Sequence, residues 1–207
     1  MGSNYAGLIT DLTTWGELDP DDENFVAALP TIIEMAEERC YRDLDLLSSV
    51  FTDDSATTTG SSRSFTLPTS IGRFIDIETV TINNVLCTPV SVATILALWT
   101  SDSVTGAPVM YARKDDTTLL IAPPPASALA VSVRGTIRPT ALSADNTETW
   151  LTLYAYDLFF TAAMVALTGY LRDWGAQSDD PRLAVSWEGE YAKRLPGAQA
   201  EEIKKRL

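Results

Sequence analysis

One long segment near the C-terminal end limits most strongly how this chain of 207 residues can fold. Residues 150–171 are patterned as a helix that is apolar nearly all round, with Asp157 as its only charge, and Gly175 is predicted to end it. A helix without a polar face must be covered on most sides. About 20 apolar residues can span a bilayer, but a carboxylate near the membrane centre costs roughly 2.5–3.5 kcal/mol. We therefore interpret the segment as a helix buried by protein, with no membrane contact.

A protein of this size has few other segments that could cover such a helix on every side. We expect part of the covering to come from a neighbouring copy of the chain. The candidates for packing between subunits are four of the aromatic residues of this helix: Trp150, Tyr154, Phe159 and Tyr170.

Two further helical segments are predicted near the N-terminus. Residues 5–15 have a helical period, which Gly16 closes. Apolar residues then recur at three- and four-residue steps over residues 29–47, with Glu and Arg opposite, which is typical of an amphipathic helix of about five turns. Cys40 falls on the apolar side and is predicted to be a core residue.

The start of this second helical region carries local signals. Asp19 is predicted to cap a helix whose first position is Pro20. The carboxylates that follow suit the positive end of the helix dipole. Pro30 is predicted to break or kink the helix.

The middle of the chain is patterned as strands. Residues 52–64 consist largely of Ser, Thr, Asp and Gly and are predicted to form a polar loop. Runs rich in Val, Ile and Thr follow at residues 64–67, 73–82, 109–113, 117–121 and 130–137, with turns at Asn83–Asn84 and Lys114–Asp116. Residues 91–99 fit either a strand or a short helix capped by Ser91, and we favour the helix.

The order of these segments predicts an α+β fold. Residues 1–50 and 148–207 are expected to form a helical bundle, built from the early helices and two C-terminal helices, with a C-terminal docking tail. Residues 61–140 are expected to form an inserted antiparallel β sub-domain. Near the C-terminus, residues 182–195 are patterned as a helix, which Pro196 and Gly197 are predicted to break before an amphipathic tail at 198–207.

Several kinds of chemistry are missing from the chain. It contains no histidine, so a Ser-His-Asp or Cys-His centre and a histidine zinc site are excluded. It also lacks a Gly-rich phosphate loop and a CxxC unit. The densest carboxylates, at 19–23, suit a helix start better than a metal site. We therefore predict no catalytic residue, no metal and no cofactor, and no enzyme.

The charge is one-sided, with 28 acidic and 15 basic residues and a formal net charge of −13. Such a chain repels DNA phosphates, although a channel through which DNA slides remains compatible with it. The last fifteen residues reverse the balance, with Lys193, Arg194, Lys204, Lys205 and Arg206 against two acids. Composition leaves two interpretations open for this basic tail: docking on an acidic partner, or a solvated helix end whose cations suit the dipole.

Several motifs, taken in order, resemble a known family. They are IEMAEERCYRDL at 33–44, FTLP at 65–68, TGAPVMYA at 105–112 with LIAPPP at 120–125, TWL at 149–151, and the segment 190–195. From about residue 10 to residue 195 the chain resembles the head–tail adaptor proteins of tailed bacteriophages, also called connector or head-completion proteins and related to tail tubular protein A.

The resemblance implies a structural virion protein at the head–tail junction, assembled in the host cytoplasm. Its partners would be the portal protein, neighbouring copies in a twelve-fold ring, the next tail or neck protein, and DNA that passes without specific binding. The C-terminal segment would dock on the portal, often becoming ordered only there. The candidate docking residues are Tyr191, Lys193, Arg194, Leu195, Lys204, Lys205, Arg206 and Leu207. The alternative is a tail-side neck or tail-terminator protein.

Overall fold

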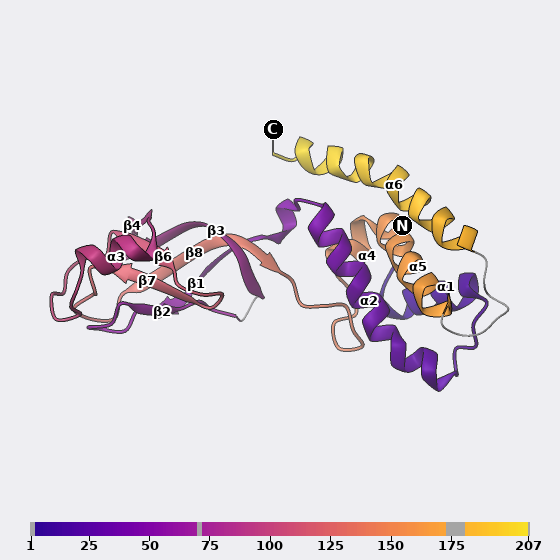
Figure 1. The fold of residues 1–207 in the computed structure, drawn as a ribbon, viewed down its shortest axis with the longest axis horizontal. Helices are drawn as coiled ribbons and strands as arrows, with labels where there is room; N and C mark the ends of the chain where they lie inside the picture. Colours follow the sequence, from indigo (N-terminus) through magenta and orange to yellow (C-terminus); the bar gives the residue numbers. More distant parts are fainter. Residues whose placement is uncertain (1–2, 70–71, 173–180, 207) are drawn as a thin grey trace. The chain divides into compact units, whose positions relative to one another are not determined.

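The structure is a computed structural model that describes residues 3–69, 72–172 and 181–206 (Figure 1). The chain divides into two compact units, which we call the helical unit (Met1–Leu47 and Thr140–Leu207) and the β unit (Ser48–Pro139). The predicted α+β fold class is confirmed, since helices precede and follow a region of strands.

The described part of the helical unit consists of α1 (Tyr5–Gly16), α2 (Glu23–Asp43), α4 (Trp150–Tyr154), α5 (Tyr156–Arg172) and α6 (Pro181–Lys204). The apolar helix α5 is the centre of this unit and packs against α1, α2, α4 and α6. Its surroundings are the buried side chains of the neighbouring helices, among them Leu8, Leu12, Phe25, Leu29, Ile33 and Tyr191. A helix that is apolar nearly all round is thus covered largely by its own chain.

The start of α2 differs from the prediction. Asp22, and not Asp19, caps the helix, because its backbone is extended and its side chain accepts a hydrogen bond from the Asn24 N–H at 2.9 Å. Asp19 instead accepts from the Asp21 N–H at 3.0 Å in the preceding turn. Pro20 therefore lies before the helix, and α2 continues through Pro30 without a break.

Two C-terminal boundaries also differ. The segment predicted as one helix from residue 150 is divided at Ala155, whose φ and ψ of −133° and 38° separate α4 from α5. No proline or glycine marks this break in the sequence. Conversely, α6 runs through Pro196 to Lys204, where a break was predicted. The predicted end at Gly175 lies outside the described residues.

The strands of the β unit form two four-stranded sheets. The first has the order β1 (Val50–Thr57), β8 (Ala130–Arg138), β3 (Arg73–Ile82), β4 (Val85–Leu86) and is antiparallel throughout. The second has the order β2 (Ser64–Thr66), β7 (Thr118–Ala122), β6 (Met110–Arg113), β5 (Thr88–Pro89). Its β5–β6 pair is parallel, which departs from the expected antiparallel arrangement. The short segments η1 (Leu47–Ser49) and α3 (Val92–Leu98) complete the elements.

Apolar side chains from both sheets form the core of the β unit, including Phe65, Phe74, Val80, Ile82, Leu119, Ile121, Val131 and Val133. Buried and more exposed positions alternate along β8, which agrees with the strand period of two. Asn83 and Asn84 both have positive φ, at 50° and 62°, so the predicted turn between β3 and β4 is confirmed. Ser91 caps α3 by accepting from the Thr94 N–H, which confirms the helix there.

The predicted polar loop at 52–64 is wrong over its first half. Residues up to Thr57 belong to β1, which pairs with β8 at the edge of the first sheet. Thr and Ser side chains suit an edge strand, because one side of such a strand stays in water. A shift of register between Asp53 and Ala56 interrupts the pairing, as a β-bulge does.

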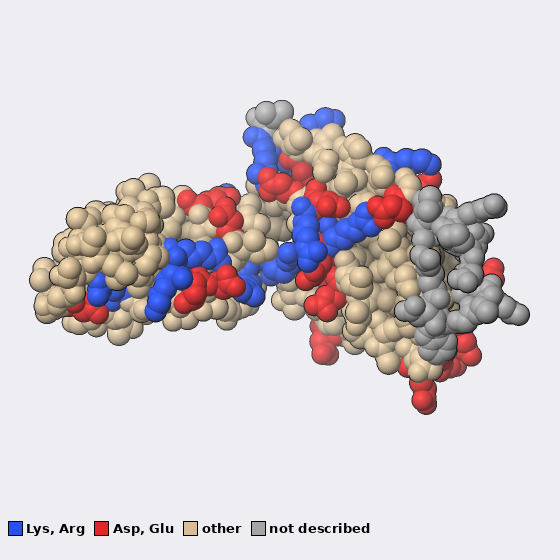
Figure 2. All heavy atoms as spheres, viewed as in Figure 1, with Lys and Arg blue, Asp and Glu red and all other residues tan. Residues whose placement is uncertain are grey.

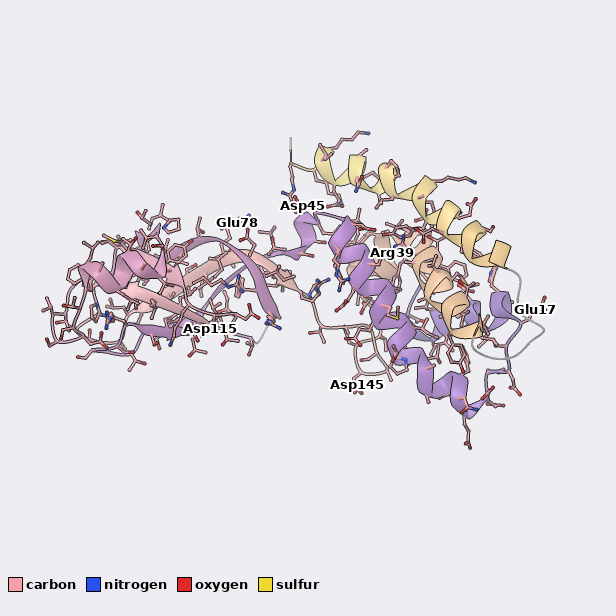
Figure 3. All side chains as sticks on the ribbon, in the orientation of Figure 1. Glu17, Arg39, Asp45, Glu78, Asp115 and Asp145 are labelled. Carbon is pink, nitrogen blue, oxygen red and sulfur yellow. The ribbon has the colours of Figure 1, made fainter. Side chains whose placement is uncertain are left out.

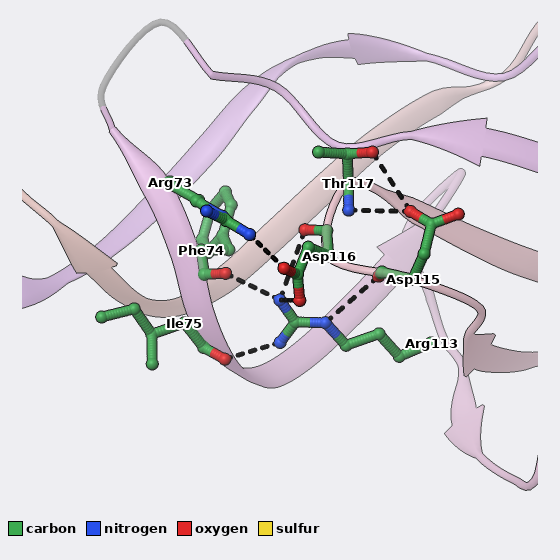
Figure 4. A network of polar contacts seen from close by, with 7 residues as sticks. All are labelled: Arg73, Phe74, Ile75, Arg113, Asp115, Asp116 and Thr117. Carbon is green, nitrogen blue, oxygen red and sulfur yellow. Dashed lines mark hydrogen bonds and ion pairs between the residues drawn. The ribbon is translucent and has the colours of Figure 1, made fainter.

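A polar network joins β3 to the turn between β6 and β7 (Figure 4). The guanidinium of Arg113 donates to the backbone oxygens of Ile75 at 2.6 Å and Phe74 at 2.8 Å. It also donates to the Asp116 carbonyl at 3.3 Å, and the Asp116 carboxylate pairs with Arg73. Arg113 therefore satisfies backbone carbonyls of β3 and of the turn between β6 and β7 with one side chain.

Candidate interaction surfaces

Helices α4, α5 and α6 enclose a groove of about 290 Å³ in the helical unit. One side carries the aromatic residues Trp150 and Tyr154, and the other carries Lys193 and Arg194 of α6. Trp150 and Tyr154 were predicted to pack between subunits, and Lys193 and Arg194 were predicted to dock on the portal. The structure brings members of both predicted sets together in one place.

Tyr154 is the most exposed aromatic residue of the groove, with 72% of its surface in solvent. Its ring centroid lies 5.9 Å from that of Trp150, and the Lys205 ammonium lies 4.7 Å from the Trp150 centroid. Tyr154 also lines a second hollow, together with Ser3, Asn4, Glu148 and Leu153. Exposed aromatic rings of this kind are enriched at protein interfaces.

The cations of the groove are paired within the chain. Lys193 contacts Glu190 at 2.7 Å, and Arg194 contacts Glu190 at 2.6 Å and Asp157 at 3.7 Å. Hydrogen bonds from Lys193 and Arg194 hold the pKa of Glu190 below its usual value. The basic surplus seen in the sequence is thus offset locally, and this side of the groove presents ion pairs.

Tyr191 does not face outward. It is 1% exposed, and its hydroxyl donates to the Asp43 carboxylate on α2 at 2.8 Å. Arg39, labelled in Figure 3, lies 4.0 Å from the Tyr191 ring centroid and donates two hydrogen bonds to Glu188, at 2.7 and 2.5 Å. Burial raises the pKa of Tyr191, and the hydrogen bond from Arg39 lowers the pKa of Glu188. Together these contacts fix α6 to α2.

The end of α6 also packs on its own chain, although docking tails of this kind often become ordered only on the portal, as the resemblance implied. Gln199 donates to the Asp43 carbonyl at 2.9 Å. Arg206 pairs with Asp45 at 2.7 Å, a residue also labelled in Figure 3. The segment is helical as far as Lys204.

The remaining predicted residues occupy different environments. Leu195, Trp150 and Tyr170 are half-buried and pack against the helical core. Phe159 is completely buried in that core, so it offers no surface to another subunit. Lys204 is exposed and makes no ion pair with any described residue. Leu207 lies outside the described residues.

The β unit carries an uncharged region that the sequence analysis missed. Residues 79–112 contain a single charged residue, Asp102, which pairs with Arg63. About a quarter of an average chain is charged, so a stretch of this length would carry several. Its exposed apolar side chains, which we call the uncharged surface, are Val85, Leu86, Leu96, Leu98, Val104 and Val109. Figure 2 shows this part of the β unit as a broad area without charge.

The two units differ sharply in charge. The helical unit contains 21 acidic and nine basic residues, a net charge of −12. The β unit contains seven acidic and six basic residues, a net charge of −1. Nearly all of the repulsion that the chain exerts on phosphates therefore comes from the helical unit.

Among the described residues, no three His, Cys, Asp or Glu side chains gather where a metal ion would bind. In the same part of the chain, no helix is long and apolar enough to cross a membrane. Both cysteines are buried, and burial raises the pKa of Cys40 to about 12.

The model of the SU10 adaptor protein family matches residues 3–205, which cover the β unit and nearly all of the helical unit. No curated protein matches the chain.

Proposed function

Because the chain belongs to the SU10 adaptor protein family, we propose that it binds the portal ring of a tailed bacteriophage and links this ring to the tail. A phage adaptor is a structural component of the virion and does not belong to a class of enzymes. The observation that carries the proposal is the family match over residues 3–205, nearly the whole chain.

The portal contact is made by the groove of the helical unit. Tyr154 supplies an exposed aromatic ring, and Lys193 and Arg194 supply hydrogen-bond donors beside it. Tyr and Arg are among the residue types that dominate binding energy at protein interfaces. Lys204 and Leu207 extend the contact beyond the groove, whereas Tyr191 serves inside the helical unit.

The contact with the next tail or neck protein is made by the uncharged surface of the β unit. Leu86 and Leu98 are 63% and 61% exposed. Exposed apolar side chains mark interaction sites when they form a contiguous patch. An uncharged partner surface of similar size would match it, since no charge on either side would need to be desolvated.

Copies of the chain form a ring around the DNA channel. The resemblance to head–tail adaptors implies that this ring is twelve-fold. A relationship to tail tubular protein A is part of the same proposal. Trp150 and Tyr170 contribute to packing between copies. DNA passes without specific binding, because the helical unit carries a net charge of −12 and repels phosphates.

Binding measurements on two sets of variants test this division of roles. Tyr154→Ala and Lys193→Glu are expected to weaken binding to portal rings at least tenfold and to leave binding to the next tail protein unchanged. Leu86→Ser and Leu98→Ser are expected to do the reverse, so each set is the control for the other. Portal binding that all four variants retain would contradict the groove assignment. Binding to tails alone would support a tail-side neck or tail-terminator protein instead.

A further inference from the structure

The chain passes between its two units twice. It leaves the helical unit after Leu47 and returns to it at Thr140. Close to each of these connections, a carboxylate of the helical unit accepts a backbone N–H. Glu202 accepts from the Leu47 N–H at 3.1 Å. Glu37 accepts from the Leu142 N–H with both of its oxygens, at 3.2 and 3.1 Å.

Both carboxylates are almost completely buried. Glu202 is 3% exposed and Glu37 is 4% exposed, in a chain whose other acidic residues lie mostly at the surface. Glutamate is almost never buried to this degree unless its oxygens are hydrogen-bonded, because an ionised carboxylate loses its hydration. In each case the backbone N–H of a connecting segment is one of the groups that replaces water.

The two carboxylates come from different elements. Glu37 lies within α2, whereas Glu202 lies in the last turns of α6. The end of α6 holds the first connection at further points, since Gln199 donates to the Asp43 carbonyl and Arg206 donates to the Asp45 carbonyl at 3.1 Å. The position of residues 43–47 therefore depends on the last two turns of α6.

We propose that Glu202 and Glu37 fix the two connections to the β unit on the helical unit, and that the end of α6 controls the first of them. When a protein partner draws the end of α6 away, Leu47 loses its acceptor and the connection gains freedom. The coupling is reciprocal, so a change that frees Leu47 makes the end of α6 easier to displace. The inference stands on the contacts of the helical unit and does not require that the partner is a portal.

Amide hydrogen exchange of the full-length protein tests each connection separately. Glu202→Ala is expected to raise the exchange rate of the Leu47 amide at least tenfold and to leave the Leu142 amide unchanged. Glu37→Ala is expected to do the opposite. The matched controls are Glu201→Ala and Glu34→Ala, which remove exposed carboxylates. Glu201 is next to Glu202, and Glu34 lies about one helical turn before Glu37.

A conservative variant separates loss of the acceptor from loss of the fold. Glu202→Gln keeps the size of the side chain and one carbonyl acceptor but removes the charge. It is expected to raise the Leu47 exchange rate by a smaller factor than alanine, and it provides a second measurement if alanine lowers the helix content. Unchanged Leu47 exchange in both Glu202 variants would overturn the proposal.

Distances between spin labels test the consequence for the β unit. Labels at Met35→Cys in the helical unit and Leu98→Cys in the β unit occupy exposed positions, while both native thiols are buried. The distance distribution is expected to broaden in Glu202→Ala and to broaden most in the Glu37→Ala, Glu202→Ala double variant. A distribution of unchanged width in a double variant with wild-type helix content would show that these carboxylates do not restrain the connections.

Discussion

The hydroxyl of Tyr191 on α6 donates a hydrogen bond of 2.8 Å to the carboxylate of Asp43, the last residue of α2. The two residues are 148 positions apart in the sequence, and their contact joins α6 to the end of α2. The resemblance to head–tail adaptors implied that Tyr191 docks on a partner. Its burial gives it instead a role in stability that can be measured.

Tyr191→Phe removes this hydrogen bond and keeps the ring. It is expected to lower the free energy of unfolding by about 1 kcal/mol, whereas Tyr191→Ala also removes a buried ring and is expected to lower it by about 3–5 kcal/mol. Urea denaturation measures both. Tyr154→Phe is the control, because loss of the exposed Tyr154 hydroxyl is expected to change the free energy of unfolding by less than about 0.5 kcal/mol. Equal effects at positions 154 and 191 would contradict the assignment.

The two thiols are expected to be unreactive in the native protein. Burial raises the pKa of Cys40 to about 12 and also raises the pKa of Cys87, so at pH 8 neither forms the reactive thiolate. A thiol reagent at pH 8 is expected to label neither residue without denaturant and both in urea. Rapid labelling of Cys40 in the folded protein would show that the core around α2 is open.

The same raised pKa values predict how stability depends on pH. A thiol whose pKa is higher in the folded state stabilises that state fully below the unfolded value of about 8.5. The contribution is lost as pH rises above that value, because only the unfolded thiol ionises there. The free energy of unfolding is therefore expected to fall between pH 8.5 and 11, and to fall less steeply in Cys40→Ala.

Arg113 is expected to be important for the β unit, because one planar guanidinium reaches carbonyls of β3 and of the turn after β6. Lysine is a single donor centre and cannot satisfy them together. Arg113→Lys is expected to destabilise the β unit by about 1–3 kcal/mol, measured by denaturation. The neighbouring exposed residue provides the control variant Lys114→Ala, for which no change beyond about 0.5 kcal/mol is expected.

Two glycines are expected to respond oppositely to alanine. A Cβ atom on Gly135 of β8 would overlap the backbone oxygen of Asp76 on β3, so Gly135→Ala is expected to destabilise the protein by about 1–3 kcal/mol. A Cβ atom on Gly169 of α5 meets nothing within 4 Å, so Gly169→Ala is expected to stabilise it by about 0.5–1 kcal/mol. Thermal unfolding of both variants checks the pair, and a stabilising Gly135→Ala would contradict the close pairing of β3 and β8.

Much of the fold was predictable because local signals agreed with tertiary structure. The run rich in Ile, Val and Thr at residues 73–82, together with Asn83–Asn84, predicted a strand and its turn, and both are present. The errors arose where distant contacts decide the outcome. Polar β1 is a strand because β8 pairs with it, and Ala155 interrupts a helix without any local breaker.

The candidate site was predictable by residue type only. Tyr154 and Lys193 were both selected, for separate reasons, but nothing in their spacing indicated that they line one groove. The buried carboxylates Glu37 and Glu202 carried no signal at all. A glutamate among other charged residues on a helix looks like part of a solvated face, and only the packed structure shows that a backbone N–H lies against it.

Electron microscopy of purified portal rings from the same phage, mixed with this protein, tests the adaptor role most directly. We predict an added layer of density on one end of the portal, with the symmetry of the ring, and its loss in the Tyr154→Ala, Lys193→Glu double variant. Bare portal rings under conditions in which the protein attaches to tails, or to neither, would contradict the portal-binding role.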